Sequence, residues 1–216
     1  VNGEWTINSL GVYPFASSPG LAVTTDNDTY ALWQCPDEKD VTQIMLAERR
    51  SGEWTIASIP YPAQDKDIGA WYAGHIPLIK VDPRGNPILF IYDREERKRV
   101  IATKINGEWS FRDLPAEIRS RGIGSFAVSP SGVVGAAFSL RVNTGFLSDT
   151  YGIGYYELSD VEEKWETVYL DDNPDDLEDE NEPGRKIIKY TSDGQPLIGF
   201  SLTGSLPSGE WVYAKK

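Results

Sequence analysis

Residues 101–110 read Ile-Ala-Thr-Lys-Ile-Asn-Gly-Glu-Trp-Ser: an apolar segment, an Asn-Gly turn, and a second segment that starts near a tryptophan. Asn-Gly between two strand-like segments is a strong short-range signal for a β-hairpin. The C-terminal residues 213–216 followed by the N-terminal residues 1–6 give a similar pattern. The two termini therefore look like the halves of one hairpin, which predicts a circular repeat with a seam.

The Gly-Glu-Trp motif recurs along the chain, with Glu-Lys-Trp at 163–165 as a degenerate copy. Packing between neighbouring repeats explains most of these tryptophans without a ligand. Trp211 is the exception, because the seam alignment places it in a third strand. The tryptophans that begin outer strands are Trp5, Trp54, Trp109 and Trp165.

A five-residue turn precedes an apolar strand in each repeat. Its fifth position is Asn27, Gly85, Gly132 or Gly194. Glycine and asparagine best tolerate a left-handed backbone, so we expect a tight turn with positive φ at each of these positions. The four positions are 58, 47 and 62 residues apart. This spacing predicts four units of about four strands each.

Units of this length are typical of β-propeller blades, and helical periodicity is not sustained anywhere. The chain resembles the β-propeller superfamily, particularly bacterial propellers with a Trp-Thr motif on the outer strand. This resemblance covers the whole chain and implies blades around an axis, but no substrate.

We therefore expect an all-β fold: a four-bladed β-propeller of four-stranded antiparallel blades, its ring closed by pairing the N-terminal strand with C-terminal strands. Four blades as part of a larger ring, or two chains sharing one ring, are alternatives. The expected single domain, 1–216, has blades at about 21–57, 78–112, 125–169, and 187–216 together with 1–8.

The composition, with 40% hydrophobic and 12% aromatic residues, suits one compact domain. The lone Cys35 excludes an intramolecular disulfide. The net charge is −12, but eight acids lie between 171 and 182, which leaves −4 for the rest. Without a basic stripe we expect no nucleic-acid partner, and without a long apolar run no membrane insertion. A monomer or small homo-oligomer, outside the cell or at its surface, is our expectation.

The acidic segment 171–182 invites a calcium interpretation. Five oxygen-bearing side chains fall at positions 1, 3, 5, 9 and 12 of the EF-hand loop spacing. However, Asp176 stands where that loop needs glycine, and Pro174 is stiff. A solvated loop is the simpler interpretation, so we expect no cofactor, with Ca²⁺ at 171–182 as the alternative. The oxygen-bearing side chains are Asp171, Asn173, Asp175, Asp179 and Glu182.

Loop lengths differ between the two ends of the predicted blades. Connections between first and second strands and between third and fourth strands are short, whereas the others are long and dissimilar, including 141–150 within the third blade. Binding residues usually lie on loops held by a rigid scaffold. The face with long loops is therefore the predicted working face.

Aromatic and arginine side chains are concentrated in these long loops, above all in 59–75. Stacking area combined with directional hydrogen bonds suits a glycan or a protein segment. Trp71 and Tyr72 packing down as a lid, and His75 as an ordinary loop histidine, are the alternatives. The predicted ligand-binding residues are Tyr13, Phe15, Tyr61, Trp71, Tyr72, His75, Arg119 and Arg121.

Enzymatic motifs are weak, and no residue is predicted to be catalytic. The Asp-box of sialidase-like propellers has only a partial counterpart at 192–194, between the wrong strands. A non-enzymatic binding module is therefore the preferred hypothesis. A glycan-processing enzyme with two carboxylates at the ring mouth and a structural part of a larger assembly are the alternatives. The carboxylates of the working face are Asp65, Asp67, Asp93, Glu95 and Asp149.

Overall fold

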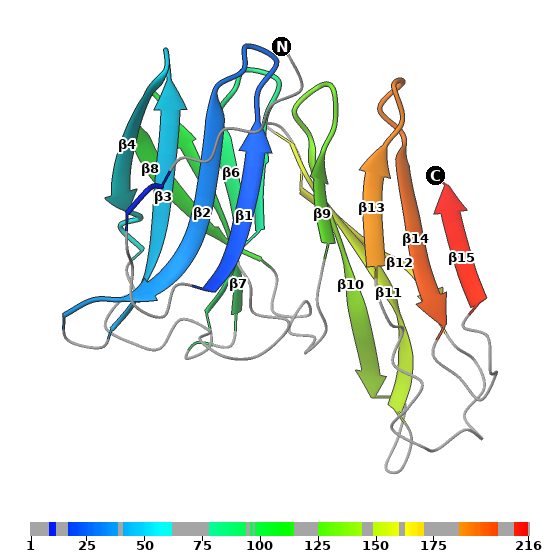
Figure 1. The fold of residues 1–216 in the computed structure, drawn as a ribbon. Helices are drawn as coiled ribbons and strands as arrows, with labels where there is room; N and C mark the ends of the chain where they lie inside the picture. Colours follow the sequence, from blue (N-terminus) through cyan, green and yellow to red (C-terminus); the bar gives the residue numbers. More distant parts are fainter. Residues whose placement is uncertain are drawn as a thin grey trace.

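The regular structure of the chain consists entirely of β-strands where the computed structural model describes it, so the all-β prediction is confirmed. The strands form four antiparallel sheets that follow one another along the chain (Figure 1). The described residues are 9–11, 17–38, 41–61, 78–93, 96, 98–114, 125–143, 149–159, 163–170, 186–202 and 210–215.

Within each sheet the strands lie side by side in chain order. Sheet 1 contains β1 (Ser17–Val23), β2 (Thr29–Pro36), β3 (Thr42–Arg50) and β4 (Glu53–Ser58). Sheet 2 contains β5 (Leu78–Val81), β6 (Pro87–Asp93), β7 (Lys98–Ile105) and β8 (Glu108–Asp113). Sheet 3 contains β9 (Ser125–Val128), β10 (Val134–Asn143), β11 (Asp149–Leu158) and β12 (Glu163–Leu170). Sheet 4 contains β13 (Lys186–Tyr190), β14 (Pro196–Leu202) and β15 (Glu210–Lys215).

The turn between the first two strands is the same in all four sheets. The φ angles at its left-handed position are 65° at Asn27, 82° at Gly85, 93° at Gly132 and 83° at Gly194. At each position the backbone N–H donates to the carbonyl three residues earlier, over 2.9 to 3.1 Å. The predicted left-handed turns are therefore confirmed.

A side-chain acceptor begins each of these turns, a feature that the sequence analysis missed. The side-chain oxygen of this first residue accepts the backbone N–H four residues later, at 2.8 to 3.0 Å. Such local bonds favour a turn over a continued strand. The four acceptors are Thr24, Asp82, Ser129 and Thr191.

Two-residue hairpin turns join the third and fourth strands of sheets 1 and 2. Both residues have positive φ in each turn: 51° and 90° at Ser51 and Gly52, and 53° and 89° at Asn106 and Gly107. This is the turn geometry that matches the twist of the flanking strands, so the predicted hairpins are confirmed. The predicted loop 141–150 is shorter than expected, because β10 and β11 stay paired as far as Asn143 and Asp149.

Alternating side chains of each sheet form the packing between sheets. Between sheets 1 and 2, Tyr30 and Leu32 of β2 belong to one buried cluster with Leu89 and Ile91 of β6. A second cluster lies between sheets 2 and 3, and a third joins sheets 3 and 4. The core is therefore a series of apolar layers between successive sheets, as face-to-face packing of twisted sheets requires.

Of the predicted outer-strand tryptophans, Trp54 and Trp109 have described side chains, and both are half-buried. Only Trp109 packs between two described sheets, as predicted. Trp109 packs against the cluster between sheets 1 and 2, its ring stacked on Phe111 with centroids 6.3 Å apart. Trp54 packs against Trp33 and its neighbours on the other face of sheet 1. Trp211 lies in β15, the third strand of sheet 4, as the seam alignment predicts.

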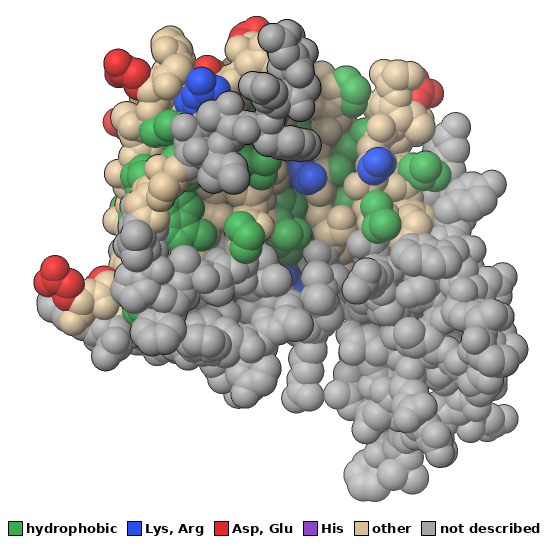
Figure 2. Space-filling model, viewed as in Figure 1, with side chains coloured by type: hydrophobic (Ala, Val, Ile, Leu, Met, Phe, Trp, Pro, Cys, Tyr) green, Lys and Arg blue, Asp and Glu red, His purple; other side chains and the backbone are tan. Residues whose placement is uncertain are grey.

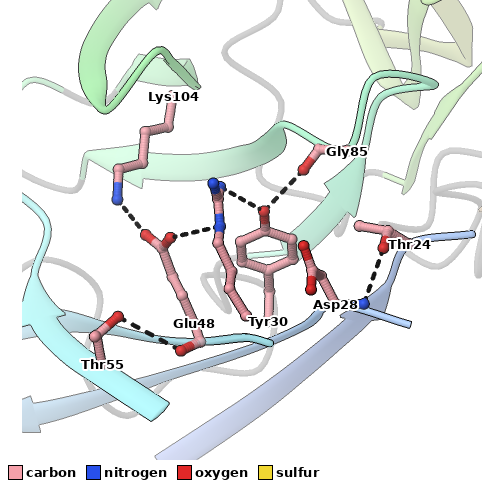
Figure 3. Close-up of polar contacts among 8 residues, drawn as sticks. Thr24, Asp28, Tyr30, Glu48, Thr55, Gly85 and Lys104 are labelled. Atoms are coloured by element: carbon pink, nitrogen blue, oxygen red, sulfur yellow. Dashed lines mark hydrogen bonds and ion pairs between the residues drawn. The ribbon is translucent and has the colours of Figure 1, made fainter. Parts of the chain in front are cut away.

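A polar network holds sheets 1 and 2 together near their short turns (Figure 3). The Tyr30 hydroxyl donates to the Gly85 carbonyl at 2.8 Å and accepts from Arg50 at 3.0 Å. Glu48 forms ion pairs with Arg50 and with Lys104 of β7. Burial raises the pKa of Tyr30, and its hydrogen bond raises the pKa of Arg50. The network therefore fixes the turn of sheet 2 against sheet 1.

The four sheets form an arc. Their first strands β1, β5, β9 and β13 contact one another in that order. Sheets 1 and 4 extend to opposite sides of the view, with sheets 2 and 3 behind them (Figure 1). Between the described parts of sheets 1 and 4 there is no comparable contact. The strand expected to close the ring, residues 1–8, lies outside the described residues, so ring closure stays a prediction.

Candidate functional site

The two ends of the sheets differ as the loop lengths predict. The short turns lie together at the upper end in Figure 1, and the strand ends that lead into long connections lie at the lower end. Among the described residues, the lower end of the junction between sheets 1 and 2 holds a buried acid, Asp93. We therefore take this region as the candidate site.

Asp93 is the last residue of β6 and is only 1% exposed. One carboxylate oxygen, Oδ2, accepts a hydrogen bond from the Tyr61 hydroxyl at 3.0 Å. The other, Oδ1, accepts the backbone N–H of Glu96 at 3.0 Å. A buried carboxylate needs such donors, because desolvation of its charge is otherwise costly. Asp93 therefore fixes both the turn that follows β6 and the side chain of Tyr61.

Tyr61 is the last described residue before the long connection between sheets 1 and 2. The backbone N–H of Ile59 donates to Ile44 in β3, so the chain stays attached to sheet 1 just beyond β4. The Tyr61 ring meets Phe111 of sheet 2 edge-on, with centroids 5.3 Å apart. Burial, reinforced by the nearby Asp93 carboxylate, raises the pKa of Tyr61 above its ordinary value. Tyr61 is thus neutral at physiological pH and donates to Asp93.

This position changes the expected role of Tyr61. The side chain is 4% exposed and belongs to the core between sheets 1 and 2. Its ring therefore contributes to packing in this arrangement instead of forming an exposed stacking surface. Its contribution to the site is to hold the chain in place immediately before residues 62–77.

Arg99 is a buried charge near the same end of sheet 2, and the sequence analysis gave it no role. It lies opposite Tyr92 on the neighbouring strand, and its guanidinium carbon is 5.2 Å from the Tyr92 ring centroid and 5.4 Å from that of Phe90. Burial lowers the pKa of Arg99 to about 10. The available signal was an arginine directly before the apolar run 100–102 of β7, because a charge carried into a buried strand needs aromatic or polar partners.

An ion pair lies at the edge of the same region. Lys98 of β7 donates to Asp113 of β8 at 2.9 Å, and this bond raises the pKa of Lys98. Both side chains are partly exposed, so the pair contributes little to stability. Asp113 is therefore a surface acid, and among the described residues Asp93 is the buried acidic group of this region.

Most of the predicted site residues cannot be placed in this geometry. Besides Tyr61, the described working-face residues are Asp93 and Asp149, and Asp149 is the first residue of β11. No group of three or more metal-ligating side chains occurs in the described part of the chain, and no helix there is long and apolar enough to cross a membrane. The predicted residues outside the described ranges are Tyr13, Phe15, Asp65, Asp67, Trp71, Tyr72, His75, Glu95, Arg119, Arg121 and the acidic segment 171–182.

Comparison with known proteins identifies the architecture. No family model matches the chain, and no curated protein matches it in sequence. An α-L-arabinanase from Penicillium chrysogenum superposes with a TM-score of 0.55 at 11% identity, over 94% of this chain and 63% of the arabinanase. A Dyadobacter fermentans protein of unknown function gives 0.52 at 11%, over 94% and 66%. The Hadza microbial sialidase Hz136 gives 0.55 at 10%, over 93% and 44%.

This chain thus spans less than two thirds of the length of each of these three structures. At such low identity the likeness concerns the fold alone. The finer resemblance, to bacterial propellers with a Trp-Thr motif, stays a prediction. The order of four antiparallel sheets and these neighbours together show that the chain has a propeller-like all-β fold.

Proposed function

We propose that this chain is a non-enzymatic binding module that uses the long-loop face, with a glycan as the first ligand class to test and a protein segment as the second. The observation that supports the proposal most directly is the hydrogen bond between Tyr61 and Asp93. It attaches Tyr61, the residue that precedes the aromatic segment 62–77, to the core between two sheets. Binding loops gain affinity when a rigid scaffold limits their freedom before the ligand arrives.

The ligand contacts in this proposal come from the loop itself. Trp71 and Tyr72 would supply the stacking surface, with His75 beside them, and Tyr61 would act from below by positioning the loop. Loss of one aromatic anchor typically costs about 1–3 kcal/mol of binding energy. Trp71→Ala and Tyr72→Ala should each weaken binding by this amount and leave the melting temperature close to that of the wild type.

A glycan array followed by titration of the best ligand tests the proposal, and Tyr61→Phe is its sharpest variant. This change removes the hydroxyl that donates to Asp93 and keeps the ring. Tyr30→Phe is the matched control, because Tyr30 is buried in the same cluster but forms its hydrogen bonds near the short turns. Both variants should lose stability, but only Tyr61→Phe should weaken binding. Equal effects of the two variants on affinity would refute a site at the long-loop end.

A second candidate function is glycan processing, which the buried carboxylate of Asp93 favours. Structures similar to this chain include an arabinanase and a sialidase. Glycoside hydrolysis generally uses two carboxyl groups, and a second one near Asp93 would have to come from the long loops. Arabinan and sialylated glycans should be incubated with the wild type and with Asp93→Asn. Sugar release by the wild type that disappears in Asp93→Asn, with binding retained, would establish this candidate over the binding module.

A further inference from the structure

Exposed apolar side chains are not scattered over the described surface. Five large ones are exposed: Leu21 (67%), Val23 (51%), Ile56 (37%), Ile105 (50%) and Ile187 (48%). Ile105 lies beside a hairpin turn at the end of β7. The other four lie on sheets 1 and 4, at the two ends of the arc. Three of these four share sheet 1, and clustered exposed apolar residues mark interaction surfaces more often than scattered ones do.

The strand register places three of them on the face of sheet 1 that points away from sheet 2. Directly opposed residues of neighbouring strands share a face. Leu21 is opposite Ala31, Val23 is opposite Thr29, and Ile56 is opposite Ala47. Ala31 and Ala47 pack in the cluster around Trp33, which is separate from the core between sheets 1 and 2. We call this side the outer face of sheet 1.

Part of this outer face is already covered. Leu10, in the segment that precedes β1, packs against the cluster of Trp33, Cys35 and Ala47. Leu21, Val23 and Ile56 nevertheless remain exposed. The covering by Leu10 is therefore incomplete.

Sheet 4 has a corresponding outer face. Ile188 and Ile198 are opposite one another and pack toward sheet 3 with Phe200. Successive side chains of a strand point to opposite faces, so Ile187 points away from sheet 3. It is opposite Gly199 and 48% exposed. In Figure 2, which has the same view as Figure 1, hydrophobic side chains are visible over both sheets on the open side of the arc.

The repeat indicates what these faces need. Each sheet has a forward face, which points toward the next sheet along the chain, and a backward face, which points toward the preceding sheet. Three times along the chain, the forward face of one sheet packs on the backward face of the next. The outer face of sheet 1 is a backward face without a preceding sheet, and the outer face of sheet 4 is a forward face without a following one. They are the two halves of one more contact of the same kind. In one chain, however, the described parts of sheets 1 and 4 make no such contact.

We propose that the outer face of sheet 4 in one copy of this chain packs on the outer face of sheet 1 in a second copy. The contact continues the packing already established between successive sheets. It is heterologous, since two different surfaces meet, and such contacts are all satisfied only when the assembly closes. Two copies related by a two-fold axis satisfy both pairs of faces with two equivalent contacts. The expected assembly is therefore a dimer.

The mass of the 216-residue chain in solution, measured across a wide range of concentrations, tests this proposal first. The wild type should be dimeric. Leu21→Lys combined with Val23→Lys on sheet 1, or Ile187→Lys on sheet 4, should raise the dimer dissociation constant about tenfold or more, because a charge would be desolvated in the contact. Ile105→Lys is the matched control, with similar exposure away from both faces, and should leave the dissociation constant unchanged. Circular dichroism establishes that each variant is folded.

Mixing two variants tests the heterologous geometry. In a dimer of the sheet 1 variant alone, each of the two contacts contains one altered face. When that variant is mixed with Ile187→Lys, the mixed dimer has one contact with two unaltered faces. Native mass spectrometry should therefore detect mixed dimers at concentrations at which each variant alone is monomeric. Failure of mixed dimers to form would overturn the heterologous contact.

Two further outcomes would overturn the proposal. A wild type that is monomeric at every concentration excludes the second copy as the partner. If, in addition, Leu21→Lys lowers the melting temperature of that monomer, the chain's own residues cover the outer face of sheet 1. A dimer that dissociates equally in Ile105→Lys uses a different surface.

Discussion

Replacing the left-handed turn residues measures how much of the fold depends on backbone conformation. Gly194 is the cleanest position, since its φ is 83° and a Cβ placed there would have no atom within 4 Å. Gly194→Ala therefore introduces conformational strain without a steric clash. Forcing an L-residue into the left-handed region costs roughly 1–2 kcal/mol, and we expect Gly194→Ala to lose about this much unfolding free energy.

Gly85→Val adds a second effect to the same strain. A Cβ at Gly85 would lie 3.5 Å from the Thr24 side chain, and a β-branched residue resists positive φ more strongly. The expected loss is about 1–3 kcal/mol. Asn27→Gly should be neutral or mildly stabilising, because asparagine already occupies φ 65° in the equivalent turn.

Urea denaturation followed by tryptophan fluorescence gives these free energies from the transition midpoint, provided that the slope stays constant. A neutral Gly194→Ala would refute the left-handed explanation, since no contact at that position could mask the strain. An Asn27→Gly loss as large as that of Gly85→Val would refute the equivalence of the turns.

Three further predictions concern packing, pH and the seam. Gly135→Ala should destabilise the junction of sheets 3 and 4, because the new Cβ would overlap the Tyr190 hydroxyl, and calorimetry should show a lower melting temperature. Burial raises the pKa of Tyr190 from 10.0 to about 12, so the stability that its neutral form contributes is complete below pH 10 and is lost as pH rises toward 12. Between pH 10 and pH 12, the melting temperature of Tyr190→Phe should therefore fall less steeply with pH than that of the wild type. Deleting residues 1–9 should leave the outer edge of β15 unpaired and cause aggregation, which light scattering measures; a deletion variant that keeps the assembly state and the melting temperature of the wild type contradicts the seam.

Turn chemistry is what the sequence revealed best. Glycine or asparagine at a position that needs positive φ is a local requirement, so Gly85 and Asn27 identify their turns without tertiary information. The same holds for Asn106-Gly107, where both residues are left-handed. Sheet order followed from these turns because consecutive antiparallel strands joined by short turns are neighbours in space.

Contacts between sheets could not be predicted from the same signals. The hydrogen bond between Tyr61 and Asp93 joins residues 32 positions apart, and the sequence around either residue does not predict it. The extension of β10 to Asn143 has a similar origin, since it depends on pairing with β11 and not on a turn residue. The contact of Arg99 with Tyr92 could be predicted only from the register in which β6 pairs with β7, and no short sequence signal fixes that register.

The short-turn end, the faces and the long-loop end of each sheet are therefore subject to different physical constraints. The short-turn end is constrained by backbone conformation, and accordingly the same turn recurs four times with a side-chain acceptor at its start. The faces are constrained by packing against the next sheet, and four of the five large apolar side chains exposed in the described part of the chain lie on the two sheets at the ends of the arc. The long connections at the other end differ in length and sequence from sheet to sheet. Changes at Gly194, Leu21 and Trp71 should accordingly alter stability, assembly and binding separately, and one substitution that altered all three would show that these demands are coupled.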